Sequence, residues 1–167
     1  PYYANEEPKA KSGVAGKVVE VILNNEYRGI YSLTETMDRK ELKLGKYDDK
    51  SQVFHGQLWK VSSWDKSTFW DIEKDYDNSQ ETWHAFETNY PDIEDVNPTD
   101  YSPLYEAIDF VANSNDDTFK KEVRDYFDIP VLKDYQIFLE VLKPIEKKKK
   151  NMYWGIYDVA QNKKLTL

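Results

Sequence analysis

"KVVEVILNNEYRGIYSLTE", residues 17–35, decides how the chain begins to fold. Apolar residues alternate through its first positions with the two-residue period of a β-strand. Asn24 and Asn25 tolerate the left-handed backbone conformation of a tight turn, and a second β-rich run follows them. Gly29 within that run indicates a bulge or a close backbone approach. The stretch therefore predicts a β-hairpin.

The next part of the chain is less regular. Residues 36–45 predict a short helix that is capped by Thr36 and ends at Gly45. Residues 53–60 predict a further strand. Residues 64–100 combine many Asp, Asn and Glu residues with scattered aromatic residues. We expect them to form a loop-rich insert with one or two short elements.

The second half of the chain is predicted to be helical and then to return to β-structure. Apolar residues recur at helical spacing in residues 102–114, 116–127 and 128–143. Residues 151–167 predict a β-hairpin with its turn at Gln161 and Asn162. Strands, then helices, then strands predict an α+β fold with segregated elements.

The composition limits the classes of function. Hydrophobic residues make up 40% of the chain and aromatic residues 15%, which excludes a disordered protein. The formal net charge of -8 makes nucleic acid and acidic membrane surfaces unfavourable partners. No apolar run approaches the roughly 20 residues of a membrane span. The chain has no cysteine, which excludes disulfides and thiolate metal sites.

A carboxylate and an amide lie five residues apart between the last predicted helix and the last hairpin. Glu146 lies in the loop, and Asn151 opens the hairpin. In phosphoryl transfer, a carboxylate in such a loop accepts the proton of an attacking hydroxyl, and an Asn five residues on ligates magnesium. The pattern alone is not specific. A solvated turn around the lysines of residues 147–150 is the alternative interpretation.

Three blocks of the chain resemble the spore coat protein H (CotH) kinase family. The first, residues 18–44, is "VVEVILNNEYRGIYSLTETMDRKELKL", which is similar to the family's hairpin and L-x-E-x-x-D segment. The second, residues 56–60, is "GQLWK", which is similar to its Gly-x-Leu-Tyr-Lys strand. The third, residues 126–167, is "YFDIPVLKDYQIFLEVLKPIEKKKKNMYWGIYDVAQNKKLTL". It is similar to the helix, loop and Asn-x-Tyr-x-x-Tyr strand of gut Bacteroidetes members.

The resemblance implies an atypical protein-kinase-like fold that transfers phosphate from Mg-ATP to Ser or Thr hydroxyls of a protein substrate. It implies that Lys60 contacts the ATP phosphates and that Glu35, from the L-x-E motif, forms an ion pair with Lys60. It implies that Asn151 binds the metal and that Glu146 is the catalytic base. The family's Bacteroidetes members also imply an extracellular or cell-surface location.

Two departures from the family pattern predict an inactive chain. Glu146 stands where the family has Asp, and a base displaced by about 1 Å costs on the order of 100-fold in rate. In the family, a Pro-Trp-Asp-Leu-Asp motif that binds the metal directly follows the last strand. That motif is expected after Leu167, so residues 1–167 lack a main magnesium ligand. We therefore expect residues 1–167 to form a single, partial CotH kinase-like domain, truncated at its C-terminus.

A non-catalytic surface module is the alternative from another functional class. Trp64, Trp70 and Trp83 lie in the irregular residues 64–100. Aromatic side chains stack on sugars and protein partners. The alternative predicts that these three residues bind a surface glycan or a protein.

Overall fold

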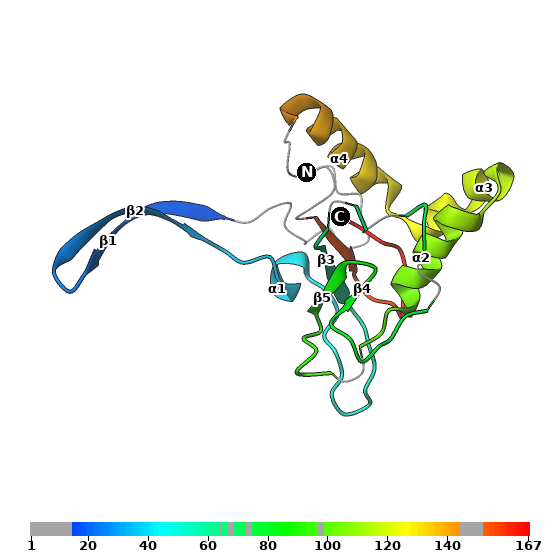
Figure 1. Cartoon of the computed structure of the whole chain (residues 1–167), viewed down its shortest axis with the longest axis horizontal. Helices are drawn as coiled ribbons and strands as arrows, with labels where there is room; N and C mark the ends of the chain where they lie inside the picture. The colour runs from blue at the N-terminus through cyan, green and yellow to red at the C-terminus, as the bar shows by residue number, and fades with distance from the viewer. Residues whose placement is uncertain (1–14, 64, 67–68, 73–74, 97–98, 144–151) are drawn as a thin grey trace.

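The computed structural model describes residues 15–63, 65–66, 69–72, 75–96, 99–143 and 152–167. These residues form two antiparallel sheets and four helices, which confirms the predicted α+β class (Figure 1). The strands are β1 (Gly16–Leu23), β2 (Glu26–Thr34), β3 (Gln57–Val61), β4 (Thr82–Trp83), β5 (Phe86–Tyr90) and β6 (Tyr153–Ile156). The helices are α1 (Arg39–Leu42), α2 (Ser102–Asn113), α3 (Asp116–Tyr126) and α4 (Ile129–Leu142).

The predicted hairpin is the two-stranded sheet of β1 and β2. Asn24 and Asn25 form its turn with φ of 52° and 62°. The register shifts between Val21 and Ile22, opposite Gly29, which has φ of 105°. A Cβ on Gly29 would meet no atom within 4 Å. Gly29 therefore provides the positive φ that the bulge requires, and no neighbouring segment requires a glycine there.

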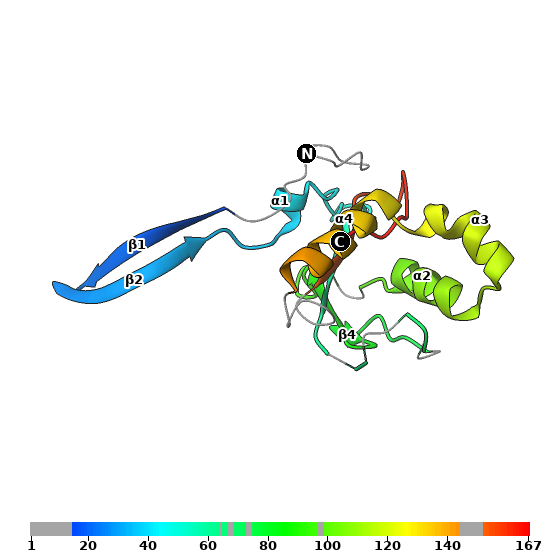
Figure 2. The ribbon, with the colours of Figure 1, turned by 90° about the horizontal axis from the view of Figure 1, so that it is seen from above.

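This hairpin extends away from the rest of the chain in both views (Figures 1 and 2). Val18 and Ile30 lie on the same face of the hairpin, because Ile30 pairs with Glu20, which is two residues from Val18. They are 77% and 67% exposed. Leu33 on the other face is 64% exposed. Both faces of the hairpin therefore present apolar side chains to solvent.

The second sheet has the strand order β4-β5-β3-β6 and carries the core. Trp59 and Val61 of β3 and Trp154 of β6 are buried on one face, in a cluster with Leu104 and Ile108 of α2. Strand β5 comes from the segment that the sequence predicts to be a loop-rich insert, yet it is an inner strand that pairs with β3. Its sequence, FETNY, has too few apolar residues to stand out as a buried strand.

Helix α1 is shorter than predicted, and its cap is not Thr36. The Asp38 carboxylate accepts hydrogen bonds from Lys40 N at 2.7 Å and Glu41 N at 3.0 Å. An Asp side chain at this position satisfies two amide groups that a helix start leaves unpaired. Lys43, with φ of 58°, closes the helix before Gly45.

The three predicted helices of the second half are confirmed as α2, α3 and α4. Asn115 caps α3, and the Asp128 carboxylate caps α4 by accepting from Val131 N at 3.4 Å. Burial decreases along α4, from Val131 at 6% exposed to Leu142 at 62%. No helix in the described parts of the chain combines the length and apolarity needed to cross a bilayer.

The C-terminal β-structure is also confirmed. Asp158 and Asn162 pair across a turn, and the chain then returns so that Thr166 and Gly155 exchange two backbone hydrogen bonds of 2.8 and 2.9 Å.

The backbones of residues 45 and 56 also lie close together, and Gly56 N donates to Gly45 O at 3.0 Å. A Cβ on Gly56 would collide with Leu44.

Candidate functional site

Lys60 lies on β3, an inner strand of the second sheet. Trp59 and Val61, its neighbours in sequence, point into the core, so Lys60 faces the opposite side of the sheet together with Leu58. Its side chain is half-buried. In the part of the chain that the structure describes, Lys60 forms no ion pair.

The strand that follows the predicted phosphoryl-transfer loop pairs with β3 beside Lys60. Tyr153 of β6 lies directly opposite Lys60, and Val61 N donates to Met152 O at 2.8 Å. On the other side of β3, Glu87 of β5 is the cross-strand partner of Lys60. Lys60 therefore lies between an acidic and an aromatic residue of the two neighbouring strands.

Glu35 directly follows the end of β2, at the open end of the hairpin. Its backbone N donates to Ala15 O, and its carboxylate accepts from Ala15 N, both at 3.0 Å. These two bonds close the open end of the hairpin. The pairing of Glu35 with Lys60 is not tested by this arrangement and stays a prediction.

Glu146 and Asn151 lie outside the described residues. The described chain resumes at Met152, whose carbonyl is already bonded to β3. The roles of Glu146 and Asn151 stay predictions.

The described residues supply one candidate group for the phosphates of a nucleotide and no cluster of candidate ligands for its magnesium ion. A half-buried lysine without an ion pair can donate to phosphate oxygens. No cluster of three or more His, Asp or Glu side chains with metal-binding geometry occurs among the residues that the structure describes. The magnesium ligands that the resemblance implies would have to come from Asn151 and further oxygen donors.

A comparison with protein-family models shows which family the chain belongs to. A family model described as CotH kinase protein matches residues 11–167. The chain belongs to the CotH kinase family. No curated protein and no solved structure matches it. Membership confirms the resemblance drawn from the hairpin, the GQLWK strand and the C-terminal block, and it assigns the chain to a kinase-like family.

The three tryptophans of the alternative function have different environments in this CotH domain. Trp70 is 69% exposed, and Trp64 lies outside the described residues. Trp83 is 4% exposed and donates from Nε1 to Asp75 O at 3.2 Å. Trp83 is therefore a core residue, and its predicted role on a binding surface is wrong.

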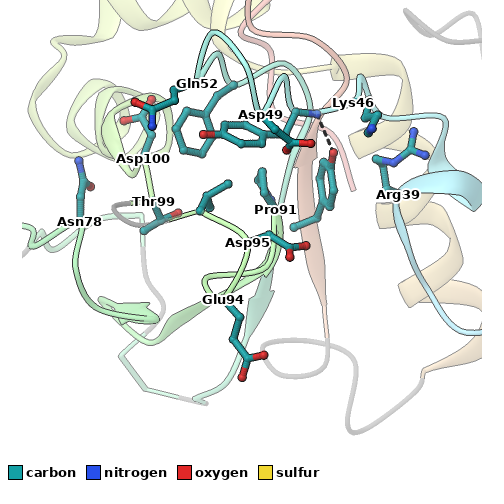
Figure 3. Close-up of a pocket in the computed structure, with 14 residues that line it drawn as sticks. Arg39, Lys46, Asp49, Gln52, Asn78, Pro91, Glu94, Asp95, Thr99 and Asp100 are labelled. Atoms are coloured by element: carbon teal, nitrogen blue, oxygen red, sulfur yellow. Dashed lines mark hydrogen bonds between the residues drawn. The ribbon is translucent and has the colours of Figure 1, made fainter.

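A pocket of about 960 Å³ lies at the Gln57 end of β3, and Lys60, near the other end of that strand, is not among its lining residues. Figure 3 shows the residues that line it. Gln57, the first residue of β3, donates from Nε2 to Asp100 O at 2.7 Å, and Asp100 lines the pocket. Gln57 and Lys60 are three residues apart on an extended strand, which corresponds to about 10 Å. The pocket and the surroundings of Lys60 are therefore two separate sites on the CotH fold. Further lining residues come from α1, residues 46–54, Asn78 and the chain after β5.

The turns around this pocket are held by carboxylates. The Asp48 carboxylate accepts from the Ser51 hydroxyl and from Lys50 N, and the first of these bonds lowers its pKa most. The Asp77 carboxylate accepts from the Ser79 hydroxyl at 2.7 Å and from Ser79 N at 2.9 Å, which lowers its pKa. Because the segments lie far apart in sequence and share no period, sequence patterns could not have found the pocket.

Proposed function

We propose that this CotH domain binds Mg-ATP and that its ancestral reaction is phosphate transfer to a Ser or Thr hydroxyl of a protein at the bacterial cell surface. The pairing of β3 with β6 carries the proposal. It brings Lys60 beside the strand that directly follows Glu146 and Asn151 in the sequence. Two separately recognised parts of the family pattern, the GQLWK strand and the C-terminal block, therefore meet along one edge of β3.

Each residue has a stated role in this proposal. The Lys60 ammonium donates to phosphate oxygens, and Glu35 holds the ammonium in position. Asn151 ligates magnesium, which neutralises charge on the phosphates when it is bound. The Glu146 carboxylate accepts the proton of the attacking hydroxyl. Because Glu146 is one methylene longer than Asp, the base is displaced, and we expect this chain to transfer little or no phosphate.

The test is a calorimetric titration of ATP with magnesium and then with manganese. The protein should show saturable binding, and Lys60→Ala should abolish it. Lys121→Ala, which removes an exposed lysine of α3, is the matched control and should bind normally. If the folded protein binds no ATP at about 1 mM, the nucleotide site is absent and the non-catalytic module is favoured.

A second variant separates the two possible tasks of Glu35. If Glu35 positions Lys60, Glu35→Gln lowers the ATP affinity with little loss of stability. If Glu35 only closes the hairpin through Ala15, Glu35→Gln leaves the affinity unchanged because its amide oxygen still accepts from Ala15 N, and Glu35→Ala lowers stability alone.

A further inference from the structure

The pocket at the Gln57 end of β3 has a mixed and ordered lining. Figure 3 shows Arg39 and Lys46 at one end, Asp49 and Asp95 in the middle, and Asn78, Thr99 and Asp100 at the other end. The pocket volume of about 960 Å³ lies in the range of roughly 300 to 1,000 Å³ that small-molecule sites occupy.

The charges of the lining disfavour a phosphate ligand. Among the lining residues that the structure describes, Arg39 and Lys46 are the only basic ones, whereas Asp49, Glu94, Asp95 and Asp100 are acidic. A nucleotide would meet net repulsion here. A strongly cationic ligand would in turn meet Arg39 and Lys46 at one end. A neutral ligand with many hydrogen-bonding groups meets neither penalty.

Several lining groups are held in place and keep hydrogen-bonding capacity. Arg39 donates from Nη1 to Leu44 O at 3.2 Å, and its guanidinium carbon lies 5.8 Å from the centre of the Tyr90 ring. The Tyr90 hydroxyl accepts from Tyr47 N at 2.8 Å. The Lys46 and Asp95 side chains form no ion pair with any residue that the structure describes.

Thr99 supplies a second, independent observation. It lines the pocket, is 2% exposed, and its hydroxyl has no hydrogen-bond partner among the described residues. Its backbone N donates to Asn78 O at 2.8 Å, which holds the residue in place. A buried hydroxyl without a partner is costly, and because its oxygen exposes less than 1 Å², a bound hydroxyl or water reaches it only after a small shift of the pocket floor.

We propose that this pocket binds a short, neutral oligosaccharide. Sugar hydroxyls both donate and accept, so they match a lining of carboxylates, amides and basic groups. Tyr47, Phe54 and Tyr90 add aromatic surface for the apolar faces of sugar rings. The proposal is independent of phosphate transfer, and it places glycan binding in a pocket away from the exposed Trp70.

The experiment titrates maltotriose, cellotriose, xylotriose and chitotriose into the full chain without nucleotide. Binding is followed by saturation-transfer NMR at about 10 mM sugar, which detects dissociation constants weaker than 1 mM. At least one trisaccharide should bind. Asp95→Asn should weaken that binding about tenfold, which corresponds to the loss of roughly 1.4 kcal/mol. Glu20→Gln, on the distant hairpin, is the matched control and should not change it.

Thr99→Val gives a second readout. It removes the buried hydroxyl while keeping the shape, so it should leave the melting temperature of the free protein unchanged or raise it, and should weaken sugar binding severalfold. A fall in melting temperature with unchanged binding would show that Thr99 is purely structural.

Three results would overturn the proposal. The first is no binding of any trisaccharide, and the second is equal binding by wild type, Asp95→Asn and Thr99→Val. The third is that trilysine binds in an Asp95-dependent way while no sugar does, since the pocket would then be a site for basic side chains. Excess Mg-ATP should leave sugar binding unchanged. Failure of the ATP titration alone would leave this inference standing.

Discussion

Lys60 and Tyr153 lie directly opposite one another on β3 and β6. The two residues belong to blocks of the sequence that resemble the CotH family separately, the GQLWK strand and the segment after Asn151. Their pairing is a long-range contact that neither block specifies alone. It makes the two blocks parts of one candidate site.

Restoring the family's Asp should speed up phosphate transfer. Glu146→Asp shortens the side chain by one methylene and should raise the rate by about 10- to 100-fold, because a base displaced by about 1 Å loses rate on that scale. The measurement is transfer of labelled phosphate to casein, a protein rich in Ser. Glu146→Gln has no carboxylate to accept the proton, so its rate should not exceed that of the wild type. Equal rates for Glu146→Asp and Glu146→Gln would exclude Glu146 as the base.

Tyr101 should make the protein sensitive to alkaline pH. Its buried hydroxyl donates to Glu81 O at 2.6 Å, and burial raises the pKa of Tyr101 to about 12. A raised folded-state pKa gives stability that is complete below the ordinary pKa of about 10 and is lost as the pH rises toward about 12. Tyr101→Phe should lose roughly 1 to 3 kcal/mol at pH 8 and should lack that alkaline fall.

The measurement for Tyr101 is urea unfolding at about pH 8, below the ordinary pKa, and at about pH 10 and 11, between the ordinary and the raised pKa. Tyr27→Phe, which changes a 60% exposed tyrosine, is the control and should follow the wild type. A parallel pH dependence in Tyr101→Phe and the wild type would contradict the assignment.

Gly56 should not tolerate a side chain. A Cβ there would lie 2.5 Å from Leu44 Cβ and 2.7 Å from Gly45 N, so Gly56→Ala should cost roughly 1 to 3 kcal/mol through overpacking. Gly16→Ala is the matched control, since its Cβ meets only the Thr34 side chain closely, at 3.2 Å. Thermal unfolding of both variants checks the difference, and equal melting temperatures would mean that residues 44–45 move aside at little cost.

The apolar side chains of the hairpin should contribute little to the stability of the isolated chain. Val18→Thr and Ile30→Thr change exposed positions and should each alter the free energy of unfolding by less than about 0.5 kcal/mol. A loss of more than about 1 kcal/mol would show that the hairpin packs against another surface in solution.

Local features of the fold followed from the sequence because they depend on neighbouring residues. The Asn24-Asn25 turn and the bulge at Gly29 each involve a few consecutive positions. Helix α1 shows the limit of such reasoning. Thr36 and Asp38 are both capable caps, and the choice of Asp38 depends on where the chain leaves the hairpin.

Long-range features did not follow from the sequence. The inner position of β5 and the pocket at the Gln57 end of β3 depend on which segments meet in space. Periodicity also predicts an apolar stripe without showing what covers it. The stripe on α4 is buried at Val131 and exposed at Leu142, although both positions fit the same helical spacing.

The pairing of β3 with β6 also has a consequence for biosynthesis. Strand β3 leaves the ribosome long before residues 153–156, with the whole helical segment between them. At about 5 to 20 residues per second, one edge of β3 remains unpaired for several seconds on every nascent chain. An open strand edge of buried residues, Leu58 and Trp59 among them, is a template for pairing with other chains. Production of this protein should therefore depend on chaperones that bind nascent chains more than on its final stability.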